Sequence, residues 1–201
     1  MSEKKLYSPA ADRNQEPILT VLKPLVKSQH RVVEIAAGSG QHSQKFAKTL
    51  RPAFYQPTDA SPEAVQSIAA YRSELPNPLI MQAPVVFDVE QSEWVFGEVD
   101  LIITINMIHI SPWTATERLL VHAERWLKPG GHLYLYGPYF ESDVVPAPSN
   151  ISFDQSLKSR DPSWGIRDLA AVTRLAHRHS LHLERRVDMP ANNLSVVFQH
   201  R

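Results

Sequence analysis

The chain of 201 residues contains no cysteine and only seven glycines, and its 21 basic and 21 acidic residues leave no net charge. Without cysteine the protein has no disulfide, no zinc site built from thiolates and no cysteine nucleophile. The balanced charge gives no general attraction to nucleic acid or to an anionic membrane. A hydrophobic fraction of 43 % with 21 % charged residues is typical of a globular chain.

Long apolar runs are also missing. No stretch approaches the roughly 20 apolar residues of a membrane helix, and the start, MSEKKLYSPAADRN, lacks the apolar core of a signal peptide. We therefore expect a cytoplasmic protein in which residues 1–201 form a single domain. Within it, residues 1–30 are expected to form a loose arm up to residue 12 and a helix over 14–28, kinked at Pro24.

Strand-like and helix-like segments alternate after residue 30. Short apolar or β-branched runs predict five strands, at residues 31–36, 53–56, 84–87, 99–105 and 132–136. Helical patterns fall at 41–50, 61–73 and 114–127, and Ser61-Pro62 is typical of a helix start. Because each connection is long enough for a crossover, we predict an α/β fold with a doubly wound, Rossmann-like sheet and helices on both faces.

The C-terminal part follows a different pattern. A helix is expected over 166–180, and two extended segments follow at 181–187 and 194–199. Only residues 188–193 separate them, which is too short for a helical crossover, so they must form an antiparallel hairpin. The hairpin completes a seven-stranded, mostly parallel sheet. The proline-rich segment 138–165 is expected to be a long loop on the substrate side, because ligands of open α/β sheets bind beyond the carboxyl ends of strands.

Two of the scarce glycines stand in the segment V32-V33-E34-I35-A36-A37-G38-S39-G40-Q41-H42. A strand, a glycine turn and a helix bring the backbone close to a ligand. Neither frame of this turn completes the dinucleotide fingerprint G-x-G-x-x-G. Glu34 is an acid in an apolar strand, which suits a cationic or amino-bearing ligand such as S-adenosylmethionine; the alternative is a salt bridge with an arginine or lysine.

Two aspartates follow the next strands. Asp59 lies 19 positions beyond Gly40, near the offset at which acids bind ribose hydroxyls; the alternative is a turn or helix-cap aspartate. Asp88 follows the third strand and could accept a hydrogen bond from an adenine amino group, although a turn aspartate accounts for it nearly as well.

Candidate catalytic and substrate residues follow the later strands or precede the first. In N106-M107-I108-H109-I110, Asn106 and His109 could face a cleft, where His109 would be a general base; the alternative is a buried structural histidine. Tyr139 is a second candidate base. Arg13, Asn14, Trp113 and Trp164 are candidates for the substrate pocket. No metal site is expected, because His177, His179 and His182 do not share one helix face.

The motifs E34-x-A36-x-G38-x-G40, Asp59, Asp88, Asn106 and Lys128-Pro129-Gly130-Gly131, with the terminal hairpin, resemble a class I S-adenosylmethionine-dependent methyltransferase. More narrowly, the chain resembles the domain-of-unknown-function 938 family, which includes the methyltransferase-like 26 protein. The motifs that carry this second resemblance are S8-P9-A10-A11-D12-R13-N14, E34 to H42, N106 to I110 and W164-G165-I166-R167-D168. Ala36 stands where class I enzymes usually have glycine, and the narrower family tends to have alanine there.

The resemblance implies an S-adenosylmethionine site formed by Glu34, Ala36, Gly38, Gly40, Asp59, Asp88 and Asn106. It implies methyl transfer to an acceptor that it does not identify; we expect a small molecule, with no nucleic acid or membrane partner and the oligomeric state open. Asn106 is followed by Met107-Ile108 rather than by the N-P-P-Y pattern, which argues against methylation of adenine N6 or glutamine N5. The alternatives are a binding module on the same fold without catalysis and, third, a nicotinamide-dependent oxidoreductase.

Overall fold

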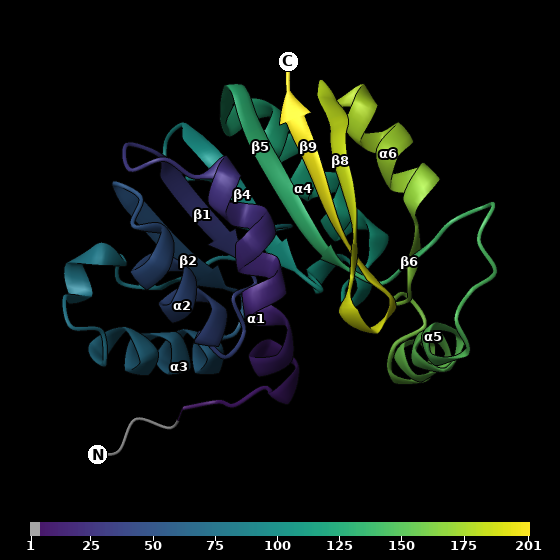
Figure 1. Ribbon diagram of the computed structural model, residues 1–201, viewed down its shortest axis with the longest axis horizontal. Helices are drawn as coiled ribbons and strands as arrows, with labels where there is room; N and C mark the ends of the chain where they lie inside the picture. Colours follow the sequence, from purple (N-terminus) through teal and green to yellow (C-terminus); the bar gives the residue numbers. More distant parts are fainter. Residues whose placement is uncertain (1–4) are drawn as a thin grey trace. The chain divides into compact units, whose positions relative to one another are not determined.

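The computed structural model describes residues 5–201 of the chain (Figure 1). Its main sheet has seven strands in the order β3-β2-β1-β4-β5-β9-β8. The strands β1, β2, β3 and β4 pair in parallel, whereas β9 pairs antiparallel with both β5 and β8. The predicted fold class, a mostly parallel sheet with a C-terminal antiparallel hairpin and helices around it, is confirmed. The chain divides into two compact units, Met1–Thr104 and Ile105–Arg201, which are described separately.

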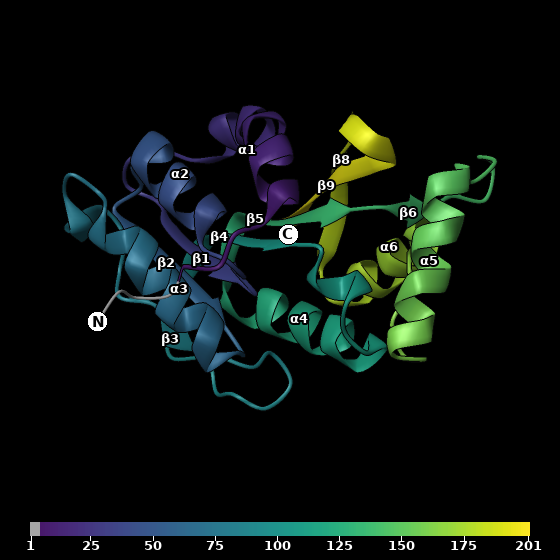
Figure 2. The same cartoon turned by 90° about the horizontal axis from the view of Figure 1, so that it is seen from below.

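The first unit contains the parallel strands. Its elements are α1 (Pro9–Leu22), the short 3-10 turn η1 (Lys23–Leu25), β1 (Arg31–Ile35), α2 (Gln41–Leu50), β2 (Phe54–Asp59), α3 (Pro62–Ser73), η2 (Pro78–Ile80), β3 (Val85–Val86) and most of β4 (Val99–Ile105). The helices α1, α2 and α3 lie side by side over one face of these strands (Figures 1 and 2). The core lies between, where Val32 and Val33 of β1 and Ile102 of β4 are fully buried.

The N-terminal helix begins earlier than the apolar spacing predicted. The Ser8 side chain accepts a hydrogen bond from the Ala11 N–H, and Pro9 occupies the first helical turn, so the helix begins at Pro9 and residues 9–12 are not part of a loose arm. The cap chemistry predicted at Ser61-Pro62 is therefore also present at Ser8-Pro9. As predicted, the helix is interrupted near Pro24, since α1 ends at Leu22. Residues 1–4 of the expected arm lie outside the described chain.

The second unit contains the antiparallel strands. Its elements are η3 (Met107–His109), α4 (Trp113–Trp126), β5 (Leu127–Gly137), β6 (Tyr139–Phe140), α5 (Pro148–Arg160), β7 (Arg167–Asp168), α6 (Leu169–Arg178), β8 (Leu181–Met189), η4 (Pro190–Asn192) and β9 (Asn193–His200). The helices α4 and α6 pack on each other and on β8, and α4 also packs on β5. A register shift between Leu183 and Arg185 marks a bulge in β8.

Three boundaries in this unit differ from those predicted. Residues 138–165 are not one loop, because they include β6 and the helix α5. That helix buries Asn150, Asp154 and Leu157, so it has no apolar periodicity by which the sequence could reveal it. The fifth strand extends to Leu127–Gly137 and includes the glycine pair. The last helix begins at Leu169, where the Asp168 side chain caps it. No helix within residues 5–201 is both long enough and apolar enough to span a membrane.

Candidate functional site

The turn after β1 is held in an unusual backbone conformation. Ala36, Gly38 and Gly40 all have positive φ, of 56°, 60° and 93°. A Cβ at Gly40 would lie 2.8 Å from the Ile68 Cα of α3, so the loop and α3 can approach only because that atom is missing. At Gly38 a Cβ would meet nothing within 4 Å, which leaves open space on that side of the turn. Ala36 is strained in a region that glycine adopts freely.

Glu34 lies at the end of β1 and is almost completely buried, with 1 % of its surface exposed. Its Oε2 accepts hydrogen bonds from the Ser43 hydroxyl of α2 (2.5 Å) and the Tyr55 hydroxyl of β2 (2.7 Å). Burial raises the pKa of Glu34 to about 7, because desolvation outweighs these two hydrogen bonds. Both donors are neutral hydroxyl groups. In the described chain Glu34 therefore pairs with two hydroxyl groups and not with an arginine or lysine, the alternative that the sequence allowed.

Asp59, at the end of β2, is brought directly against the glycine turn. Its Oδ2 accepts a hydrogen bond from the Gly38 N–H (2.8 Å), and its Oδ1 accepts one from the Ser61 N–H (2.9 Å). The carboxylate is half-buried. Asp59 therefore links the turn after β1 to the start of α3. Its hydrogen bond with the Ser61 N–H is also that of a turn aspartate, the alternative that the sequence allowed.

Asp88 follows β3 and forms a local turn. Its Oδ1 accepts a hydrogen bond from the Glu90 N–H (2.9 Å), and its own N–H donates to the Ser92 hydroxyl (2.9 Å). This is the Asx-turn arrangement. Contact with adenine stays a prediction for this residue.

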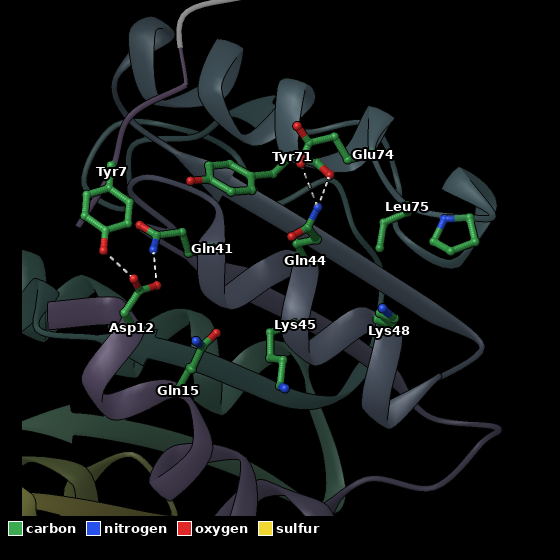
Figure 3. A pocket seen from close by; sticks show the side chains of 11 residues that line it. Tyr7, Asp12, Gln15, Gln41, Gln44, Lys45, Lys48, Tyr71, Glu74 and Leu75 are labelled. Carbon is green, nitrogen blue, oxygen red and sulfur yellow. Dashed lines mark hydrogen bonds between the residues drawn. The ribbon is translucent and has the colours of Figure 1, made fainter. Parts of the chain in front are cut away.

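A hydrogen-bond network that the sequence did not reveal joins the N-terminal residues to the glycine turn; Figure 3 shows its Tyr7, Asp12 and Gln41 side chains. The buried Gln41 side chain accepts from the Ser8 N–H (2.6 Å) and the Ser39 hydroxyl (3.0 Å), and it donates to Asp12 (2.6 Å). Asp12 also accepts a hydrogen bond from Tyr7. The only sequence signal for this network is that S8-P9-A10-A11-D12 and G40-Q41-H42 are both motifs; nothing in their spacing pairs them.

The same segment is tied to α3. The Leu6 N–H donates to the buried Ser67 hydroxyl (2.8 Å), which in turn donates to the Ser39 carbonyl (2.7 Å). The Tyr71 hydroxyl donates to the Leu6 carbonyl (3.2 Å). We call residues 5–12 the N-terminal strap, because their hydrogen bonds converge on the glycine turn.

A cavity of about 390 Å³ opens beside the strap (Figure 3). Its lining is mostly polar and comes from the strap, α1, α2, α3 and the residues just after α3: Tyr7, Asp12, Gln15, Gln41, Gln44, Lys45, Lys48, Tyr71, Glu74, Leu75 and Pro76. Glu34, Asp59 and Asp88 do not line it. The cavity therefore lies beside the predicted cofactor residues and is not formed by them.

The two candidate substrate residues of α1 have different surroundings. Asn14 is buried, and its Oδ1 lies 2.7 Å from His42 Nε2. Burial lowers the pKa of His42 to about 4, so this imidazole is neutral at physiological pH. Arg13 is exposed on the surface of α1. A role of either residue in binding a substrate stays a prediction.

In the second unit, the segment after β4 makes a tight turn at Asn106. Asn106 has a positive φ of 62°, and its N–H donates to the Tyr136 carbonyl of β5 (2.8 Å). The following turn, η3, places His109 inside the unit with no exposed surface. A Cβ at Gly137 would lie 2.5 Å from His109 Nε2 and 3.1 Å from the Asn106 side-chain oxygen. Glycine at 137 thus makes room for both side chains.

His109 and Tyr139 share an unusual lack of hydrogen bonds. Their rings meet edge to face, with centroids 5.0 Å apart and planes at 82°. Within residues 5–201, neither ring nitrogen of His109 nor the hydroxyl of Tyr139 has a hydrogen-bond partner, although these atoms are buried. Burial, with the nearby charge of Arg167, lowers the pKa of His109 to about 3, and burial raises the pKa of Tyr139. Both groups are neutral, and both have unused capacity for hydrogen bonding.

The two candidate tryptophans are half-buried and each lies under a guanidinium. Arg167 lies 5.7 Å from the ring centre of Trp113, and Arg160 lies 5.0 Å from that of Trp164. The structure therefore gives both rings cation–π partners. A cavity of about 250 Å³ in this unit is lined by Tyr139 and by residues of the segment after β6, α5 and the β8–β9 tip, but not by either tryptophan.

Comparison with solved structures identifies the class of fold as that of the class I methyltransferases. An O-methyltransferase family protein from Burkholderia thailandensis matches with a TM-score of 0.78 at 15 % identity, over 95 % of this chain and 57 % of that one. Human N-acetylserotonin methyltransferase in complex with SAM matches with a TM-score of 0.76 at 14 % identity, over 95 % and 52 %. The chain thus spans little more than half the length of these two proteins.

A third similar structure is nearer in length. It belongs to a complex between the Haloferax volcanii Trm112 methyltransferase activator and a candidate methyltransferase, with a TM-score of 0.71 at 18 % identity, over 94 % of this chain and 91 % of that one. The family itself follows from the sequence as a whole. The model of the family described as "Protein of unknown function (DUF938)" matches residues 5–200, so the chain belongs to this family.

Proposed function

We propose that the protein is an S-adenosylmethionine-dependent methyltransferase that acts on a small-molecule acceptor. The observation that carries this proposal is the hydrogen bond between the Gly38 N–H and Asp59 Oδ2, with open space beside Gly38. It joins a glycine turn without a phosphate-binding fingerprint to an acid at the end of the next strand. That combination suits a cofactor with a ribose and an amino acid moiety but no phosphate.

The charge and hydrogen-bonding capacity of these residues support this cofactor. Asp59 is half-buried and has lone pairs beyond those used by Gly38 and Ser61, with which it would accept the ribose hydroxyls. Glu34 would act on the amino group of the methionine moiety, directly or through water, since a cation beside it would favour its ionised form. Asp88 would accept from the adenine amino group, and Asn106 would contribute its side-chain amide.

The cofactor supplies an electrophilic methyl group on a sulfonium, so the task of the protein is chiefly to position the acceptor. An acceptor that keeps its proton also needs a base. His109 is the proposed base: its ring nitrogens have no hydrogen-bond partner of good geometry in the described chain, and its imidazole is neutral, with a pKa of about 3 that makes it a weak base suited to an acidic acceptor group. Tyr139, protonated and in edge contact with His109, is suited to donate a hydrogen bond to the same acceptor group.

Calorimetric titration with S-adenosylhomocysteine tests the cofactor part of this proposal. We expect binding by the natural protein, and affinity about 10- to 100-fold lower in Asp59→Ala, which loses hydrogen bonds to a charged acceptor. Glu63→Ala is the matched control, because Glu63 is an exposed acid in the first turn of α3. Absence of binding at millimolar concentration would refute the proposal, and a fluorescence response to NADH would instead favour the oxidoreductase.

The transfer reaction is tested separately with cofactor that carries a labelled methyl group. We expect label to enter the small-molecule fraction of a cell extract, and His109→Asn to reduce that incorporation. Cofactor binding without transfer to any fraction would favour a binding module on the same fold. Label in the nucleic acid or protein fraction would contradict the small-molecule acceptor.

A further inference from the structure

The motif W164-G165-I166-R167-D168 has no role in the function proposed so far, yet it wraps the turn that carries His109. The Gly165 N–H donates to the His109 carbonyl (3.0 Å). Arg167 donates through Nε to the Ile108 carbonyl (2.8 Å) and through Nη2 to the Ser111 carbonyl (2.6 Å). Three carbonyl groups of residues 108–111 thus accept hydrogen bonds from two residues of this motif.

The motif is itself anchored by contacts with two helices, α5 and α6. In α5, which precedes the motif, Asp154 accepts a hydrogen bond from the Ile166 N–H (2.8 Å) and pairs with Lys158 (2.6 Å). A Cβ at Gly165 would lie 2.9 Å from Asp154 Oδ1 and 3.1 Å from Lys158 Cε, so a larger residue there would displace these side chains. After it, the Asp168 side chain accepts from the Ala171 N–H (2.7 Å) and caps α6. The guanidinium of Arg167 therefore extends from a fixed base.

His109 depends on this support because, within residues 5–201, neither nitrogen of its ring makes a hydrogen bond of good geometry. Its imidazole packs against the backbone at Gly137 and the edge of Tyr139, and the Gly165 backbone interacts with it and raises its pKa, against the larger effect of burial. The orientation of the ring is consequently set by the backbone of residues 108–111. A ring fixed by its own hydrogen bonds would tolerate small changes in that backbone, whereas this one follows them.

We propose that Arg167 is a positioning residue, whose guanidinium fixes the turn at residues 108–111 and thereby the place and orientation of the His109 imidazole. The catalytic consequence rests on the proposed function, in which His109 is the base; the structural linkage does not. Arginine suits this task because its planar fork donates in two fixed directions, to Ile108 and Ser111, which the single ammonium of lysine cannot reproduce.

The positive charge of Arg167 also acts on the His109 ring, because it lowers the pKa of the imidazole. The groups near this region are Arg167 from β7, Tyr139 from β6, and Asp154 with its partner Lys158 from α5; Asp154 acts on Arg167. Of the two cations, Arg167 is the one that lowers the pKa of the imidazole and so opposes its protonation. Its loss would favour protonation twice, by removing that charge and by loosening the burial of the ring.

The test follows the His109 imidazole by NMR in protein with labelled histidine, its signal assigned by its disappearance in His109→Asn. We expect Arg167→Gln to raise the pKa of His109 by about 1 unit or more and to weaken the contact between the His109 and Tyr139 rings. Arg167→Lys keeps the charge but loses the fork, so we expect it to weaken the ring contact as well. Arg174→Gln, which removes an exposed charge from α6, is the control and should leave both readouts unchanged.

Unchanged ring contact and titration in Arg167→Gln would overturn the proposal. Full rescue of both readouts by Arg167→Lys would overturn it too, because charge alone would then account for the effect. If Arg167→Gln does not fold, the ring contact in Arg167→Lys decides the question. None of these readouts needs an acceptor or a cofactor, so failure of the natural protein to bind S-adenosylhomocysteine would refute the proposed function and leave this result standing.

Discussion

The glycine turn after β1 and the turn that carries His109 solve the same problem, the burial of polar groups, in opposite ways. At the glycine turn, Glu34 accepts two hydroxyl hydrogen bonds and Asp59 accepts two from backbone N–H groups. At the His109 turn the backbone is well bonded, but the His109 ring nitrogens and the Tyr139 hydroxyl have no partner among the described residues.

The polar groups of the first region are thus satisfied within the chain, whereas the second region keeps buried polar atoms without partners among the described residues. A buried polar atom without a partner costs about 1–3 kcal/mol, so proteins keep few of them, and those that persist call for an explanation. Polar atoms of a bound molecule would supply the missing partners at His109 and Tyr139. The glycine turn, in contrast, is ordered by hydrogen bonds from the chain's own residues.

The largest expected effect tests how tightly the glycine turn is built. Gly40→Ala places a Cβ 2.8 Å from the Ile68 Cα at a φ of 93°, and we expect it to lower the free energy of unfolding by about 4 kcal/mol in urea denaturation. Gly97→Ala is the control: it shares the left-handed strain but meets nothing within 4 Å, and we expect a loss of only about 1 kcal/mol. Equal losses would show that the contact with α3 is unimportant.

The second effect is a pH dependence that comes from Glu34. Burial raises its folded-state pKa from 4.5 to about 7, so its contribution to stability is complete below pH 4.5 and is lost as the pH rises to about 7. The loss amounts to about 3 kcal/mol. Glu34→Gln removes this titration, so the difference in unfolding free energy between the two proteins should change by that amount between about pH 4 and about pH 8. A constant difference would mean that Glu34 keeps its ordinary pKa.

Removal of a tyrosine hydroxyl should change the stability of the protein in opposite directions in the two regions. Tyr55→Phe removes a hydroxyl that donates to the buried Glu34, and we expect it to destabilise the protein by about 2 kcal/mol. Tyr139→Phe removes a buried hydroxyl that has no partner among the described residues, and we expect it to stabilise the protein by about 1 kcal/mol. Urea denaturation of both variants measures this. Destabilisation by Tyr139→Phe would erase the contrast between the two regions.

The smallest effect concerns the N-terminal strap. Gln41→Ala leaves the strap, Ser39 and Asp12 without their common partner, and we expect a loss of about 1 kcal/mol with faster hydrogen exchange at residues 38–41. Gln15→Ala is the matched control, because Gln15 lines the same cavity from α1 but is not part of this network. Equal exchange rates in the two variants would show that the strap does not hold the turn.

The sequence was sufficient where a single segment determines the outcome. The apolar run of β4, the glycines after β1 and the short link between β8 and β9 each report a local requirement, and together they predicted the order of the elements. The sequence was insufficient where contacts between distant segments determine the structure. Gln41 bonds to residues some 30 positions away, and α5 buries polar rather than apolar residues, so neither leaves a periodic signal.

The site shows the same limit. The position of Asp59 beside the glycine turn is predictable because its offset from that turn is constrained by one strand and one helix, whereas its contact with a ribose stays a prediction. The dependence of His109 on Arg167 spans 58 positions, and the two residues meet through backbone carbonyls, whose direction no side-chain pattern encodes. Burial without a partner, the property that distinguishes His109 and Tyr139, belongs to the packed structure and to no motif.

The bulge in β8 has a consequence for how copies of the protein behave in a crowded solution. β8 is one edge of the main sheet, with backbone groups that another chain could pair with. The register shift between Leu183 and Arg185 disrupts that edge, and the charged side chains Glu184, Arg185, Arg186 and Asp188 surround it. A strand arriving from a second molecule would meet an uneven ladder and charged side chains, several of which are already paired within the chain. We therefore expect this edge to resist growth into aggregates, even at high protein concentration.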